Sequence, residues 1–169
     1  MTGKAMKVLF LCTGNSARSI MAESLLQRRG EGRFESYSAG SMPRGKVNPL
    51  AIEILREESF ETGAFRSKSW DEFAEEDAPK LDFIFTVCDR AADEVCPIWP
   101  GQPVSAHWGI EDPDQPQLSM EQQRKLFRKA FSELDHRIKI FSRLPIDKLD
   151  ALSLQKQLDE IGNTLPDTS

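Results

Sequence analysis

The sequence predicts an α/β fold in which helices cover a parallel sheet, and three observations favour this class. Apolar runs alternate along the chain with segments of helical spacing. The runs 6–12 (MKVLFLC) and 81–88 (LDFIFTVC) are apolar almost throughout, which is typical of strands buried on both faces. The length of 169 residues is that of one domain with its own core. Strands that alternate with helices pair in parallel through right-handed crossovers, so we expect a single sheet.

Turn and cap residues set the bounds of the predicted elements. Gly30 ends the first helical pattern, and Asn48 followed by Pro49 is a typical start for the second. Ser119 and Gln122 form a capping box before a long helical pattern. The predicted elements are, in chain order, strand 6–12, helix 16–30, strand 34–40, helix 48–58, a short amphipathic helix over 69–77, strand 81–88, a weaker strand 103–109, a helix from 119 that ends before Pro145, and a helix over 149–161.

All of these elements belong to one predicted domain, 1–169, with a core over 6–143 and a helical tail over 145–162. The composition is mildly acidic, with a net charge of −5 and a pI near 5.2. A nucleic-acid-binding protein normally carries a basic excess, and a membrane-surface protein a basic amphipathic face; neither is evident here. We therefore expect neither nucleic acid nor membrane as a partner.

The sequence also predicts where the protein works. Its apolar runs are shorter than the ~20 residues that span a bilayer, and the segment MTGKAMK lacks the features of a secretory signal. Three cysteines, an odd number, argue against a structural disulfide framework. We expect a cytoplasmic protein with reduced thiols, in which any disulfide is transient, catalytic or redox-sensing.

Chemistry-bearing residues gather where the predicted strands end. Cys12 and Cys88 close two strands, and the segment 107–113 (HWGIEDP) follows a third. In parallel α/β sheets, ligands bind beyond the carboxyl ends of the strands. The sequence therefore predicts a site at this edge of the sheet.

The segment CTGNSARS, residues 12–19, has the features of an anion-binding loop. Gly14 and Asn15 tolerate positive φ, so the backbone can turn its N–H groups inward ahead of a helix N-terminus. Arg18 offers a bidentate fork for a tetrahedral oxyanion, and this positive field should lower the pKa of Cys12. Ser19 could donate a hydrogen bond to the thiolate. The predicted oxyanion-binding residues are Thr13, Gly14, Asn15, Ser16, Ala17 and Arg18.

With this loop, the chain resembles the low-molecular-weight tyrosine phosphatase superfamily, and more closely its thioredoxin-coupled arsenate reductases. The resemblance runs from KVLFLCTGNSARS through AG, TVC, CP and HWG to DP. It implies a three-layer fold, a four-stranded sheet in the order 2-1-3-4, and neighbouring first and third strands. Cys12 and Cys88 would then lie side by side, within plausible reach of a disulfide.

Cys88 and Cys96 each have a simpler interpretation, since free cysteines are commonly buried apolar residues. The resemblance instead implies a three-cysteine relay that ends at Cys96. Eight residues of helix would rise about 12 Å, whereas disulfide-linked Cα atoms lie roughly 4.4–6.8 Å apart, so a Cys88–Cys96 bond requires any helix there to melt. Seven residues separate the two cysteines here, against six in the best-known members.

Asp112 is the predicted general acid. Glu111, Asp112 and Asp114 could each be a solvated loop carboxylate, but Pro113 restricts the backbone of Asp112, and Asp112 matches the family's aspartate before proline. His107 is assigned a structural role. With only two histidines, far apart in sequence, we expect no metal site.

The sequence thus predicts an arsenate reductase that needs no cofactor or cation. The resemblance implies that Cys12 attacks arsenate, Cys88 and Cys96 carry the resulting disulfide, and thioredoxin or another thiol donor such as a glutaredoxin or mycothiol system restores the thiols. The alternative is a low-molecular-weight phosphatase for phosphate monoesters. Asp114 and Gln115 stand where tyrosine-specific members carry aromatic residues, which counts against it. A non-catalytic anion sensor is a further alternative, which the presence of both Cys12 and Asp112 disfavours.

Overall fold

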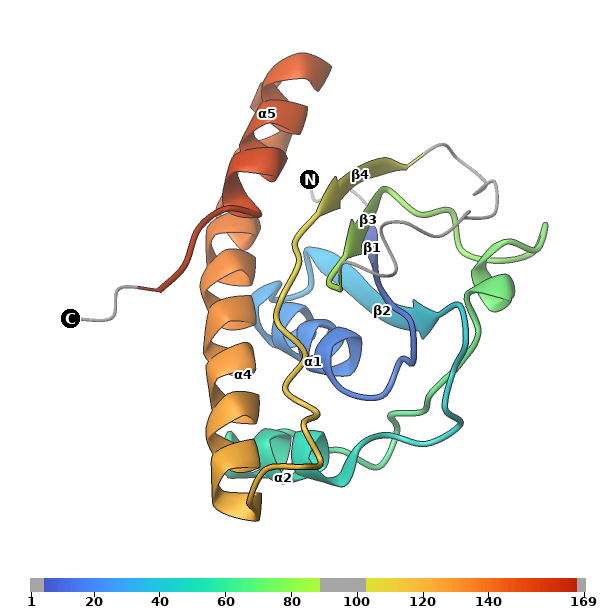
Figure 1. Cartoon of the computed structure of the whole chain (residues 1–169). Helices are drawn as coiled ribbons and strands as arrows, with labels where there is room; N and C mark the ends of the chain where they lie inside the picture. Colours follow the sequence, from blue (N-terminus) through green and yellow to red (C-terminus); the bar gives the residue numbers. More distant parts are fainter. Residues whose placement is uncertain (1–4, 89–102, 167–169) are drawn as a thin grey trace.

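The computed structural model describes residues 5–88 and 103–166. They form a parallel sheet in the order β2-β1-β3-β4 together with helices, which confirms the predicted class, strand order and C-terminal helices (Figure 1). The elements are β1 (Met6–Cys12), α1 (Arg18–Arg29), β2 (Phe34–Gly40), α2 (Pro49–Glu57), the 3-10 turn η1 (Trp70–Phe73), β3 (Phe83–Thr86), β4 (Val104–His107), α4 (Met120–Ser142), the 3-10 turn η2 (Ile146–Lys148) and α5 (Ala151–Ile161).

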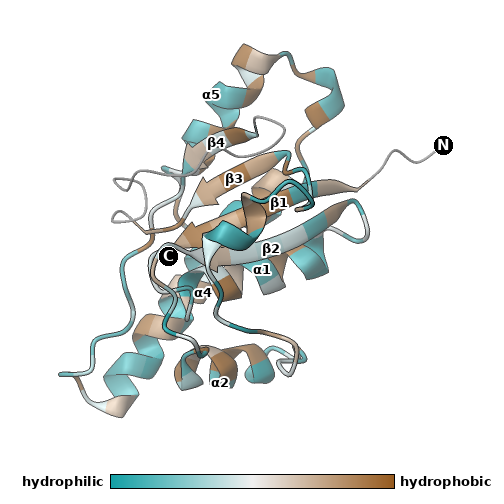
Figure 2. Ribbon diagram, turned by 90° about the vertical axis from the view of Figure 1, so that its right-hand side faces the viewer, coloured by the Kyte–Doolittle hydropathy of each residue, from teal (hydrophilic) through white to brown (hydrophobic). Residues whose placement is uncertain are grey.

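The alternation of side chains along β1 divides the core between the two faces of the sheet. Val8 and Phe10 are fully buried in the larger cluster, which holds the apolar residues of α1, α2, α4 and α5. Leu9 and Leu11 point to the other face, where they pack with Phe73 of η1. Figure 2 shows the apolar central strands β1 and β3 beside the helices. From Val8 to Cys12, β1 is buried on both faces, and this part of its sequence is apolar throughout rather than alternating.

Two predicted elements differ from the structure in extent. The helix expected over 69–77 is a single 3-10 turn, Trp70–Phe73, capped by the side chain of Ser69. In a longer helix Asp71 would face Glu75 and Glu72 would face Glu76, and like charges four residues apart destabilise a helix. The last helix begins only at Ala151, after the cap residue Asp150, because η2 precedes it.

The carboxyl ends of the strands meet at one edge of the sheet, as predicted. Leu11 of β1 pairs with Thr86 of β3, and Cys12 pairs with Gly40 of β2. A Cβ atom on Gly40 would lie 2.4 Å from the carbonyl oxygen of Thr13, so only glycine lets β2 approach the loop this closely. The sheet therefore holds the start of the loop from both sides.

An aromatic cluster lies under this edge. Trp108 is fully buried and stacks on Phe85 with ring centroids 3.8 Å apart, while Phe10 and Phe141 pack around them. The indole nitrogen of Trp108 donates to the carbonyl oxygen of Leu158 in α5 at 2.9 Å. This packing fixes the chain just before the segment that carries Asp112. None of the helices in the described ranges is long and apolar enough to cross a membrane.

Candidate active site

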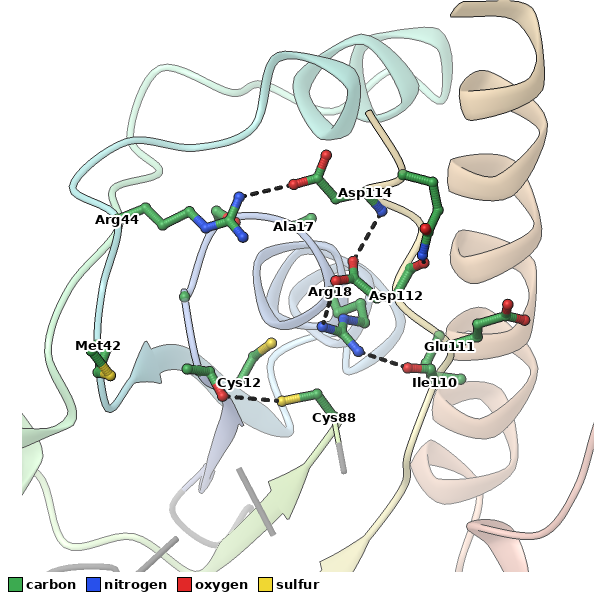
Figure 3. Close-up of a pocket in the computed structure, with 14 residues that line it drawn as sticks. Cys12, Ala17, Arg18, Met42, Arg44, Cys88, Ile110, Glu111, Asp112 and Asp114 are labelled. Atoms are coloured by element: carbon green, nitrogen blue, oxygen red, sulfur yellow. Dashed lines mark hydrogen bonds and ion pairs between the residues drawn. The ribbon is translucent and has the colours of Figure 1, made fainter. Parts of the chain in front are cut away.

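A pocket of about 630 Å³ opens at the carboxyl end of β1 (Figure 3). It brings together Cys12, Arg18, Cys88 and Asp112, and also four other residues of the predicted oxyanion-binding loop: Thr13, Gly14, Ser16 and Ala17. Cys96 lies outside the described residues. The lining residues are Cys12, Thr13, Gly14, Ser16, Ala17, Arg18, Met42, Arg44, Cys88, Ile110, Glu111, Asp112, Asp114 and Gln115.

The backbone of the loop 12–19 is oriented by hydrogen bonds from a second segment, 41–48. The carbonyl oxygens of Thr13, Gly14 and Ser16 accept hydrogen bonds from N–H groups of that segment at 2.9, 3.0 and 2.7 Å. A trans peptide points its N–H opposite to its C=O. The N–H of Gly14 accordingly faces away from 41–48, and it donates to the sulfur of Cys12. The loop thus has the polarity expected of an anion-binding nest.

Asn15 stabilises the loop from behind rather than lining the pocket. It is fully buried with φ of 43°, as its residue type predicted, whereas Gly14 does not adopt a positive φ. Its amide donates to the hydroxyl oxygen of Ser19 at 2.9 Å and its carbonyl accepts from the backbone N–H of Lys68 at 2.8 Å. Because the Ser19 hydroxyl accepts this hydrogen bond through its oxygen, its own hydrogen is still available to donate.

Cys12 and Cys88 are both buried and lie close together at the floor of the pocket (Figure 3). The prediction of a lowered pKa for Cys12 is wrong for this arrangement. A hydrogen bond with the Cys88 thiol and burial raise the pKa of Cys12, and they outweigh the lowering by Arg18 and by the Gly14 N–H. The segment 12–19 contains the groups that lower the pKa of Cys12. Cys88, which raises it, comes from another part of the chain.

Arg18 is held by the segment that carries the predicted acid. Its guanidinium donates to the carbonyl oxygen of Ile110 at 2.8 Å and lies 3.6 Å from the carboxylate of Asp112. The second carboxylate oxygen of Asp112 accepts from the N–H of Asp114 at 2.9 Å, an Asx turn around Pro113. Arg18 is mostly buried and Asp112 is about half exposed, and both line the pocket.

A buried ion pair stands behind the loop, between Lys68 and Glu23. The Lys68 side chain is only 9% exposed, and its ammonium lies 3.9 Å from the Glu23 carboxylate, which also accepts from the Ser38 hydroxyl. Burial lowers the pKa of Lys68 and raises that of Glu23. Within the described ranges, no group of three or more His, Cys, Asp or Glu side chains could hold a metal ion.

The other candidate residues lie at the periphery. Glu111 is exposed and pairs with Lys129 of α4 at 3.8 Å, and the ring of His107 hydrogen-bonds the hydroxyl of Thr86 at 2.7 Å. Arg44, which was not among the predicted site residues, pairs with Asp114 at 2.8 Å across the pocket. Asp114 was considered only as an alternative acid. The segment 41–48 has no recognisable motif, so nothing in the sequence pointed to Arg44.

Comparison with known proteins gives consistent matches. The family model described as low molecular weight phosphotyrosine protein phosphatase matches residues 7–157. An arsenate reductase of Halalkalibacterium halodurans is 36% identical over 135 residues, which covers 80% of this chain and 94% of the relative.

Solved structures agree with this sequence match. An arsenate reductase from Archaeoglobus fulgidus has a TM-score of 0.63 and 27% identity over 80% of this chain and 98% of its own. A thioredoxin-dependent arsenate reductase from Corynebacterium glutamicum has a TM-score of 0.58 and 25% identity over 83% of this chain and 62% of its own.

Proposed function

This chain belongs to the low molecular weight phosphotyrosine protein phosphatase family and is an arsenate reductase on that fold, and we propose that Cys12, Cys88 and Cys96 carry its reaction. The observation that carries the proposal is the contact of two buried cysteines at the floor of a pocket whose backbone and Arg18 suit a tetrahedral oxyanion. The proposed setting is the cytoplasm, where thiol donors keep cysteines reduced.

In the first step, arsenate binds to the loop N–H groups and Arg18, and the sulfur of Cys12 bonds to arsenic. One arsenic–oxygen bond breaks, and Asp112 donates the proton that lets this oxygen leave as water. Because the Cys88 thiol and burial raise the pKa of Cys12, its proton must leave as the oxyanion binds. A dianionic oxyanion at this place is itself a base that can take it.

In the second step, the sulfur of Cys88 attacks the sulfur of Cys12. A disulfide forms, the sulfur–arsenic bond breaks, and its electron pair stays on arsenic, which leaves as arsenite. Two thiols are thereby oxidised by two electrons and arsenic(V) is reduced to arsenic(III). The thiolate of Cys96 then attacks Cys88, releases Cys12, and leaves a Cys88–Cys96 disulfide for an external dithiol of the thioredoxin type.

The test is consumption of NADPH in the presence of thioredoxin and thioredoxin reductase, with and without arsenate, for the wild type and Cys96→Ser. We expect arsenate-dependent turnover in the wild type and its loss in the variant. The variant should still complete one turnover, seen by mass spectrometry as the loss of two hydrogen atoms in a Cys12–Cys88 disulfide.

Turnover in Cys96→Ser at the wild-type rate would contradict the three-cysteine relay. Absence of turnover in the wild type, repeated with glutathione and glutaredoxin, would contradict the reductase and leave the phosphatase.

A further inference from the structure

An ion pair joins the two rims of the pocket. On one rim lies Arg44, from the segment 41–48, and on the other lies Asp114, from the segment that follows β4. The guanidinium of Arg44 donates to the carboxylate of Asp114 at 2.8 Å (Figure 3). Figure 3 shows this pair on the opposite side of the pocket from Cys12 and Cys88.

The backbones of Arg44 and Asp114 both hydrogen-bond to residues of the predicted site. The N–H of Arg44 donates to the carbonyl oxygen of Gly14 at 3.0 Å, and the N–H of Asp114 donates to the carboxylate of Asp112 at 2.9 Å. The Arg44 side chain also packs on Gly14, where an added Cβ would lie 3.2 Å from Nε of Arg44. The position of the pair is therefore set by the loop on one side and by the acid on the other.

The chemistry of the site directs a bound ester toward this pair. In an in-line displacement the leaving group departs opposite to the nucleophile, here away from Cys12 and toward Asp112. An inorganic oxyanion places only an oxygen there. An aryl ester places its ring there, on the side of the pocket where the side chains of Arg44 and Asp114 meet.

We propose that Arg44 and Asp114 form a clasp over the pocket that makes the site selective for small inorganic oxyanions over aryl esters. The proposal rests on the oxyanion site of the proposed function and adds a specificity determinant to it. Arg44 has 58% of its side chain exposed, so the clasp is a weak, solvent-screened pair that can open. Its contribution to selectivity is accordingly about two- to fivefold, the range that exposed ion pairs support.

The test compares two probes that need no turnover, inorganic phosphate and phenylphosphonate, by isothermal titration calorimetry on the reduced protein. The quantity measured is the ratio of the two dissociation constants, phenylphosphonate over phosphate. We expect Arg44→Ala and Asp114→Ala each to lower this ratio by about two- to fivefold, because either change opens the clasp. The double variant should have the same ratio as each single variant, since the ion pair is already broken in each of them.

Two further measurements separate a clasp from other roles. The exchanged pair, Arg44→Asp with Asp114→Arg, should bring the ratio back toward the wild-type value. Salt at about 1 M should lower the wild-type ratio and leave the ratio of the alanine variants unchanged, because only the wild type has a pair to screen. The matched control is Arg128→Ala, which removes an exposed ion pair with Glu57 between α4 and α2 and should leave the ratio unchanged.

Two outcomes overturn the clasp while phosphate binding is intact: an unchanged ratio in both single variants, or equal weakening of both probes by Arg44→Ala alone. The second outcome would make Arg44 a simple anion-binding residue. Failure of the wild type to bind phosphate at all would instead overturn the oxyanion site and the proposed function with it. Failure of the clasp and failure of the proposed function therefore give different results in the same titrations.

Discussion

The environment of Cys12 combines opposing influences on its pKa. The Gly14 N–H and the guanidinium of Arg18 favour the thiolate, as in any anion-binding loop, while burial and the Cys88 thiol disfavour it. Burial and the Cys88 thiol outweigh the other two influences, so the pKa of Cys12 is raised. The same closeness of two sulfurs that raises the pKa also places Cys88 where the proposed second step needs it.

The first prediction concerns this thiol pair. In a Cys96→Ser background, Cys88→Ala should lower the pKa of Cys12, because the largest cause that raises it is removed. A shift of one pKa unit changes the thiolate fraction tenfold, so alkylation by iodoacetamide at pH 7 should accelerate at least ~10-fold. Cys88→Ser, which keeps a hydrogen-bonding group, should show a smaller change. An unchanged or slower reaction in the alanine variant would show that burial alone sets the pKa.

At the scale of elements, the end of β2 determines how the loop can lie. The second prediction is that Gly40→Ala displaces the loop, because the new Cβ would meet backbone oxygens of Cys12 and Thr13 at 2.7 and 2.4 Å. Overpacking of this kind costs about 1–3 kcal/mol of unfolding free energy. Phosphate binding by calorimetry should weaken as well. Gly63→Ala, where a Cβ would meet nothing within 4 Å, is the matched control and should change neither quantity.

The segment 66–69 supports the loop from the other side. The third prediction is that Lys68→Met destabilises the protein by about 1–3 kcal/mol at pH 7, since it leaves the Glu23 carboxylate desolvated without its cation. Lys68 lowers the pKa of Glu23, so its loss raises that pKa further. When the pKa of a carboxyl is higher in the folded than in the unfolded chain, the free energy of unfolding falls as the pH rises above the ordinary pKa of the group, which is 4.5 for Glu23.

The destabilisation by Lys68→Met should therefore be smaller at pH 5 than at pH 7, in urea unfolding curves. Lys129→Met serves as the control, because Lys129 pairs with Glu111 at a similar distance of 3.8 Å but both side chains are exposed. It should change stability by less than about 0.5 kcal/mol at either pH. An equal effect of Lys68→Met at both pH values would show that the charge of Glu23 is not what Lys68 compensates.

Elements with a strong local pattern were predictable from the sequence, and contacts between loops were not. The run 6–12 and the capped helices have apolar periodicity that local physics fixes, and their bounds agree with the structure closely. Cys12 and Arg18 were found because they share one short loop. Arg44 and the burial of Lys68 depend on how separate loops fold against the sheet, for which no periodicity in the sequence gives a signal.

At the scale of the whole molecule, α4 and α5 lie along one side of the protein (Figure 1). In α5, Leu158 is fully buried and its carbonyl accepts from Trp108, two residues before the carbonyl that holds Arg18. We infer that the tail is part of the same cooperative unit as the core.

The fourth prediction tests this unity with two leucines of the same helix. Leu158→Ala should lower the unfolding free energy by about 2–5 kcal/mol, because it leaves a cavity in the buried core. Leu152→Ala, whose side chain is 82% exposed, should change it by less than about 0.5 kcal/mol. Differential scanning calorimetry should show one transition in each protein, with its midpoint lowered only in Leu158→Ala. A separate early transition in that variant would mean that α5 unfolds alone, and the chain would then consist of a core and an independent tail.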